Sequence, residues 1–167
     1  MANSTLFLFL PFVLFIGIWV SWSDMKFMKI PNKAVMALLA VWLVVGLLAV
    51  AFTPLTIKSW AGGWALAAII LVAGFVANAV NLIGAGDAKF AAAMAPFFVG
   101  GNIRLILALY AASLLGAFAV HRLARAIPAV RRTTEDWVSW TNKDFPMGLA
   151  LAGTLIFYLF AQFLPAF

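Results

Sequence analysis

Two aspartates, Asp24 and Asp87, each stand alone beside a long apolar segment. The chain has five acidic residues, and the other three, Glu135, Asp136 and Asp144, share one polar stretch. An ionisable side chain beside hydrocarbon is costly, so its position is by default a functional hypothesis. Two carboxyl groups brought close in a poorly solvated site do not both ionise easily, which yields one acid and one base. The pair therefore predicts hydrolysis of an amide bond by an activated water, without a metal or a cofactor.

Two glycines precede the second aspartate in the string Gly84-Ala85-Gly86-Asp87. Glycines so close together mark backbone that leaves the regular helix. Irregular backbone at membrane depth is tolerated where it is buried in protein or lines a watery cavity, so we expect Asp87 to face such a cavity. A plainer alternative stays open, in which Asp87 caps the following helix through its free N–H groups. Lys89 is expected to meet lipid phosphate rather than substrate, because it lies on a different helical face from Asp87.

Asp24 begins a basic string that ends in Pro31-Asn32, where one segment is expected to stop and the next to start. Its alternative role is an ion pair with Lys26 or Lys29 at the membrane interface, a screened contact worth little. An acid at the carboxyl end of a helix is disfavoured by the helix dipole. The position is therefore slightly costly, and this favours a functional role for Asp24.

The composition is that of an integral membrane protein: 66% of the residues are hydrophobic, 10% are charged, and the mean hydropathy is +1.11. A soluble domain carries about 25% charged residues. Counting about 20 apolar residues for each crossing predicts a single all-α domain over residues 1–167 with six transmembrane helices. The expected spans are residues 5–23, 33–52, 60–81, 87–100, 102–121 and 147–165. The fourth is the shortest of the six. It is expected to be a short span, to include part of the preceding turn, or to be a re-entrant segment.

Positive charge between the spans predicts the orientation, because short cytoplasmic loops carry the excess of Lys and Arg. Only Lys58 and Arg104 fall on the other side, which leaves nine of the eleven positive charges on one face. This places both termini outside, in the periplasm, with residues 122–146 as a cytoplasmic loop and both isolated aspartates at the cytoplasmic face. The net charge of +6 is expected to face anionic membrane lipid, with no nucleic acid implied. The lone His121 is interpreted as an interfacial residue rather than a metal ligand.

The polar loop contains a further expected element. Thr133 precedes Glu135 and Asp136 in the manner of a helix amino-terminal cap. We expect a short helix that lies on the membrane, with the rings of Trp137 and Trp140 turned toward the lipid.

Taken together, these strings resemble the bacterial type IV prepilin peptidase family, among the intramembrane aspartyl proteases that share a G-x-G-D motif. The resemblance is greatest to the short Tad/Flp-pilus type, and it covers nearly the whole chain. It rests on Asp24 with the ending Ile30-Pro31-Asn32, on Gly84-Ala85-Gly86-Asp87-Ala88-Lys89, and on Phe145-Pro146-Met147-Gly148. Similar proteins usually carry an aromatic residue where Met147 stands.

The resemblance implies a peptidase of the bacterial inner membrane that cuts the leader from a prepilin at the cytoplasmic face, after a Gly that precedes the pilin's hydrophobic helix. It makes Asp24 and Asp87 the catalytic dyad and implies no cofactor and no metal. Supporting residues are Gly84, Gly86, Lys89, Pro31, Asn32, Pro146 and Gly148. The pilus-assembly machinery is a possible partner. Longer relatives also methylate the new amino terminus through an extension with paired cysteines. This chain has no cysteine and only a short loop over residues 26–33, so no methyltransferase domain is expected.

Two other classes stay open. In a proton-coupled transporter, Asp24 and Asp87 would relay protons, although both are expected at one face rather than at the midplane. In a non-catalytic assembly factor of the pilus, the two acids would be helix caps.

Overall fold

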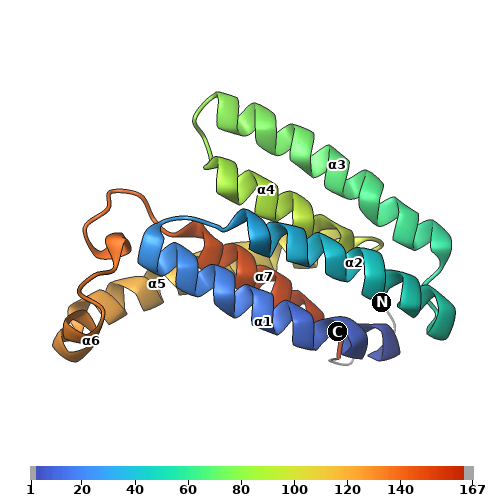
Figure 1. Ribbon diagram of the computed structural model, residues 1–167, viewed down its shortest axis with the longest axis horizontal. Coiled ribbons are helices and arrows are strands. Elements are labelled where there is room, and N and C mark those ends of the chain that lie inside the picture. The colour runs from blue at the N-terminus through green and yellow to red at the C-terminus, as the bar shows by residue number, and fades with distance from the viewer. Residues whose placement is uncertain (1–2, 164–167) are drawn as a thin grey trace.

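The computed structural model describes residues 3–163, and this part of the chain contains helices and no strand (Figure 1). The elements are α1 (Asn3–Phe27), α2 (Asn32–Phe52), α3 (Ile57–Ala79), α4 (Ala85–Met94), the 3-10 helix η1 (Ala95–Phe98), α5 (Ile103–Ala126), α6 (Pro128–Thr133), the 3-10 helix η2 (Val138–Trp140) and α7 (Met147–Ala161). Helices α1, α2, α3 and α5 are long and apolar enough to cross a membrane, and α7 is a shorter apolar helix. The predicted all-α class is confirmed, while the predicted count of six spans stays a prediction.

The fourth predicted span, residues 87–100, is a shorter α-helix followed by one turn of 3-10 helix. Pro96 lacks a backbone N–H, which ends the α-helical hydrogen bonding after Met94. Gly100 then turns the chain with a φ of 69°, a conformation that favours glycine. Of the last predicted span, 147–165, residues 164 and 165 lie outside the described residues.

Helix α1 continues past the predicted end of the first span, so Asp24 lies in its last turn rather than beyond it. The helix stops where Met28 adopts a φ of 53°. Helix α5 likewise extends to Ala126, beyond the predicted residue 121. It ends at Ile127, because the residue before Pro128 is pushed into an extended conformation.

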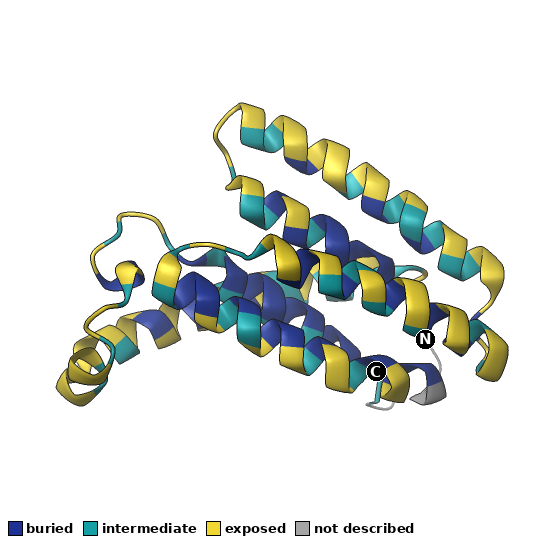
Figure 2. Cartoon of the chain, in the orientation of Figure 1, coloured by how far each residue is buried: buried dark blue, intermediate teal, exposed yellow. Residues whose placement is uncertain are grey.

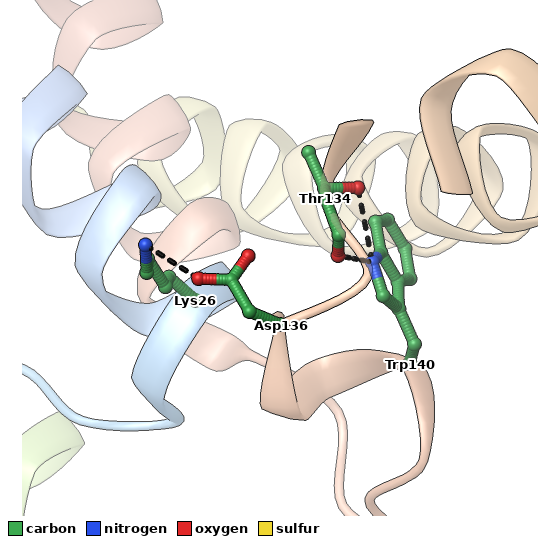
Figure 3. A network of polar contacts seen from close by, with 4 residues as sticks. All are labelled: Lys26, Thr134, Asp136 and Trp140. Carbon is green, nitrogen blue, oxygen red and sulfur yellow. Dashed lines mark hydrogen bonds and ion pairs between the residues drawn. The ribbon is translucent and has the colours of Figure 1, made fainter. Parts of the chain in front are cut away.

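The expected helix after Thr133 is wrong, since Thr133 is the last residue of α6. Proline at the first helical position starts this helix earlier in the chain. Trp140 does not face lipid either: it is buried, and its indole N–H donates to the backbone oxygen of Thr134 at 2.8 Å and to the hydroxyl of Thr134 at 3.1 Å (Figure 3). Its ring stacks on that of His121 with centroids 5.1 Å apart, which anchors the loop to α5. His121 is thus a buried packing residue.

The core lies between α1, α2, α4 and α7, whose facing sides are buried, while α3 presents mostly exposed residues (Figure 2). Phe9, Trp42 and Phe97 form its aromatic centre, with ring centroids 5.2 to 5.4 Å apart. Exposed apolar side chains on α3 and α5 are expected of surfaces that face lipid. Helices α1 and α7 pack antiparallel, with Phe7 near Phe163 at one end and Asp24 against Gly148 at the other. The close packing of α1 on α7 therefore brings the start of α7 to Asp24.

Candidate active site

Asp24 is only 5% exposed, and its carboxylate is held by the beginning of α7. The backbone N–H of Gly148 donates to Asp24 Oδ2 at 2.6 Å. Gly148 is the second residue of α7, and the first N–H groups of a helix have no partner within the helix. The positive end of the helix dipole also favours a carboxylate at this place. The contact offsets part of the cost of burying Asp24.

Gly148 is required at this contact because of its missing side chain. A Cβ atom there would lie 2.9 Å from Asp24 Oδ2 and 3.0 Å from Asp24 Cβ. Real Cβ atoms hardly ever come so close to a neighbour, so any larger residue would push α7 away from α1. Pro146 is the residue that precedes the first turn of α7, and its fixed φ sets the entry into the helix.

Asp87 lies in the first turn of α4, and its carboxylate is turned back over Gly84, the residue that caps the helix. A Cβ atom on Gly84 would lie 2.7 Å from Asp87 Oδ2. This is one half of a capping box, in which the third helical residue reaches back to the cap. Gly84 has no side chain to supply the other half. Gly86 differs, because its Cβ would meet Ile30 at an ordinary 3.5 Å. The first glycine of the motif, not the second, makes room for the carboxylate.

The structure brings Asp24 and Asp87 together at the walls of two cavities. One, of about 360 Å³, is also lined by Lys29, Asn32 and Lys89. The other, of about 560 Å³, is the more polar of the two and is called the polar cavity below. The expectation that Asp87 faces a cavity is confirmed. Both carboxylates therefore face the same two spaces.

The predicted supporting residues differ in how they reach the cavities. Asn32 and Lys89 line the smaller one, where Lys89 is exposed beside both aspartates. Pro31 lines neither and serves as the residue before α2, its carbonyl accepting the N–H of Ala34 at 2.9 Å. Gly86 lines the smaller cavity, across from Ile30.

Sequence reasoning missed the amide side chains of the polar cavity. Asn78, Asn81 and Asn142 line it together with Asp144. The side chain of Asn78 also donates to the carbonyl of Ile83 at 2.8 Å, which fixes the turn that leads to Asp87. The sequence did contain a signal for these residues, because two asparagines three residues apart end an otherwise apolar segment. Within residues 3–163, no three side chains of His, Cys, Asp or Glu gather as a metal site would require.

Residues 8–120 match the model of the type IV leader peptidase family. The chain belongs to this family. The matched region contains Asp24, Asp87 and the two glycines of the motif, whereas Gly148 lies beyond it. No match was found to a curated protein or to a solved structure. Membership of the type IV leader peptidase family implies a protease whose substrate is a prepilin.

Proposed function

We propose that this leader peptidase is an aspartic endopeptidase that removes the leader of a Flp-type prepilin, with Asp24 and Asp87 as its catalytic pair. The observation that carries the proposal is that both carboxylates line the same two cavities, although 63 positions separate 24 from 87 in the chain. Each carboxylate rests on a glycine, Gly148 or Gly84, that leaves no room for a side chain. The shared cavities favour a working pair over two independent helix caps, because two caps have no need to face the same space.

The reaction follows from one ionised and one protonated carboxyl group. The ionised carboxylate takes a proton from water while the water oxygen forms a bond to the carbonyl carbon of the peptide. The protonated carboxyl gives its proton to the carbonyl oxygen, which yields a neutral tetrahedral diol. The C–N bond then breaks, the first carboxyl passes its proton to the leaving nitrogen, and the second takes a proton back from a hydroxyl group. Both aspartates thereby return to their starting states.

The proposed setting is the bacterial inner membrane. Residues 1–167 act as one peptidase domain with both termini in the periplasm, and the loop 122–146 faces the cytoplasm beside the catalytic pair. The bond to be cut follows a glycine at the start of the pilin's hydrophobic helix, where glycine weakens the helix and lets the strand open toward the two carboxylates. The new amino terminus is left unmethylated, and the product passes to the pilus-assembly machinery.

The test is a cleavage assay in membranes that contain the full-length peptidase and a Flp-type prepilin. Asp24→Asn and Asp87→Asn each keep the size of the side chain but cannot transfer the proton, so we expect each to lower cleavage by about a hundredfold or more. Asp144→Asn is the matched control, because Asp144 lines the polar cavity without belonging to the pair. Full cleavage by either Asn variant of the pair would contradict the proposal.

Two further measurements address the setting. Reporter fusions within residues 122–146 are expected to report the cytoplasm, and a periplasmic signal would overturn the orientation. Mass spectrometry of the mature pilin is expected to find a free amino terminus, and a methyl group added by the purified peptidase would overturn the absence of a methyltransferase activity.

A further inference from the structure

An apolar groove of about 540 Å³ begins at Asp87 and follows α4 and η1 along the bundle. Its floor is a single stripe of α4 and η1 that includes Asp87, Ala91 and Phe98. One wall is α3 and the other is α5, with α7 at the base. The lining side chains are almost all apolar, so water is a poor occupant of this groove in a membrane.

The groove is open on its lipid side because its two walls hardly touch each other. Helix α3 packs on α4 and η1, and α5 packs on α7. Figure 1 shows α3 at one edge of the bundle, with α4 beneath it. A membrane-embedded helix can therefore enter from the side between α3 and α5, without any unfolding of the peptidase.

The groove is continuous with the polar cavity that holds the two aspartates. Ile83, Asp87 and Met147 line both spaces, so the apolar groove ends where the polar cavity begins. A chain that lay across this junction would change from an apolar to a polar environment beside Asp87. This is the environment that a peptide needs when a hydrophobic helix follows directly on a polar segment.

We infer that this groove binds the hydrophobic helix of the substrate immediately after the bond to be cut. The inference deepens the proposed function and rests on it. The floor is about 20 Å long from Asp87 to the end of η1, which is about two thirds of the roughly 30 Å of membrane hydrocarbon. Small floor residues such as Ala91 let the backbone of a second helix approach closely, as at other interfaces between membrane helices. A lipid chain would fill the groove but would gain nothing from its junction with the polar cavity.

The chain has no cysteine, so a cysteine introduced for disulfide trapping is the only thiol of the peptidase, and any crosslink can be assigned to it. The peptidase carries Asp24→Asn, so that a Flp-type prepilin with one cysteine in its hydrophobic helix stays uncut. Ala91→Cys is expected to crosslink best to a substrate thiol about four residues beyond the uncut bond, one helical turn from Asp87. Leu107→Cys, on the α5 wall between Ile103 and Tyr110, is expected to crosslink best to a substrate thiol on the helix face that turns toward α5, and poorly to thiols one or two residues away.

Ala108→Cys is the matched control for Leu107→Cys, since Ala108 is the next residue of α5, is exposed, and does not line the groove. We expect it to crosslink at least about tenfold more slowly, because a disulfide requires the two Cβ atoms within about 4.5 Å. Equal crosslinking at positions 107 and 108 would overturn the inference, and so would crosslinking that does not depend on the position of the substrate thiol. The proposed function would still stand in either case, provided that the wild type cleaves the prepilin. If the wild type cleaved no Flp-type prepilin, the proposed function and the groove inference would fall together.

Lipid as the true occupant is tested with a membrane-soluble maleimide. Labelling of Leu107→Cys is expected to slow when uncut prepilin is added to vesicles of phosphatidylglycerol and phosphatidylethanolamine. Labelling that is slow in lipid alone and unchanged by prepilin would assign the groove to lipid and overturn the inference.

Filling the groove gives an independent measurement. Ala91→Phe is expected to raise KM for the prepilin by about tenfold with a smaller change in kcat, because the added ring occupies space that the substrate helix needs. Ala108→Phe adds the same ring to the lipid-facing side of α5 and is expected to leave both constants within about twofold of the wild type. An unchanged KM in Ala91→Phe, with thermal stability retained, would contradict the inference.

Discussion

The backbone N–H of Gly148 donates a 2.6 Å hydrogen bond to Asp24 Oδ2, which joins the first turn of α7 to the last turn of α1. The two residues are 124 positions apart in the chain. Because this contact holds the buried carboxylate in place, any change in the packing of α1 on α7 also changes the geometry of the candidate site.

Replacement of Gly148 by alanine is the most direct test of this contact. The new Cβ would lie 2.9 Å from Asp24 Oδ2, so we expect the site to be displaced and cleavage of prepilin to fall by about tenfold to a hundredfold. Overpacking of this kind costs about 1–3 kcal/mol of stability. Gly153→Ala on the same helix is the control, because its Cβ would make ordinary contacts at 3.6 Å with Ser113. Equal activity of the two variants would show that the close approach at Gly148 does not matter.

The two glycines of the motif are expected to differ in their tolerance of alanine. Gly84→Ala places a Cβ 2.7 Å from Asp87 Oδ2 and should lower cleavage by about tenfold or more, since the carboxylate must turn away. Gly86→Ala meets only Ile30 at 3.5 Å and should keep activity within about threefold of the wild type. Initial rates of prepilin cleavage compare the two. A greater loss of cleavage in Gly86→Ala than in Gly84→Ala would contradict the prediction that Gly84 is the glycine that makes room for the carboxylate.

An ion pair between a half-buried lysine and an exposed aspartate links the loop to the end of α1, close to Asp24. Lys26 Nζ lies 2.7 Å from Asp136 Oδ2 (Figure 3). Pairs of this kind contribute little on their own, so we expect Lys26→Met to lower cleavage by less than about threefold. The charge-exchanged double variant, Lys26→Asp with Asp136→Lys, keeps an ion pair between the loop and the helix. We therefore expect it to recover most of the cleavage that Lys26→Met loses. A double variant no better than the worse single variant would contradict this role.

The same pair predicts a dependence of loop order on pH. The hydrogen bond from Lys26 holds the pKa of the Asp136 carboxyl below its usual range. A carboxyl with a lowered pKa in the folded state stabilises that state above its unfolded pKa of about 3.9, and the contribution is lost as the pH falls through the lowered value. Hydrogen exchange over residues 134–141 should therefore be faster in Asp136→Asn than in the wild type at neutral pH, and the difference should shrink as the pH falls below the unfolded pKa of about 3.9. A difference that did not shrink on acidification would have another cause.

Cleavage itself should follow a bell-shaped pH profile. A pair that works with one ionised and one protonated carboxyl is inactive when both are protonated and when both are ionised. Initial rates measured between about pH 4 and 8, with the fold checked at each end, test this expectation. A flat profile would argue against a coupled pair of aspartates.

The sequence by itself determined the helical class and the two isolated aspartates. Hydropathy and helix stops are local properties, so α2 begins and ends within a residue of the predicted span 33–52. The Gly84 to Asp87 string likewise carried its own signal, and it lies within the region that matches the family. The role of Asp24 and Asp87 as a catalytic pair stays a prediction for the cleavage assay.

Only the tertiary structure decided what each residue meets across the bundle. The sequence does not specify that a Cβ on Gly148 would strike Asp24 while one on Gly86 would not, because the neighbours come from distant segments. Trp140 was expected to face lipid, yet it packs on His121 and donates to Thr134, partners that local hydropathy cannot identify. The groove beside Asp87 exists for the same reason: it is the space between α3 and α5, and a space between helices is a property of their packing rather than of any one segment.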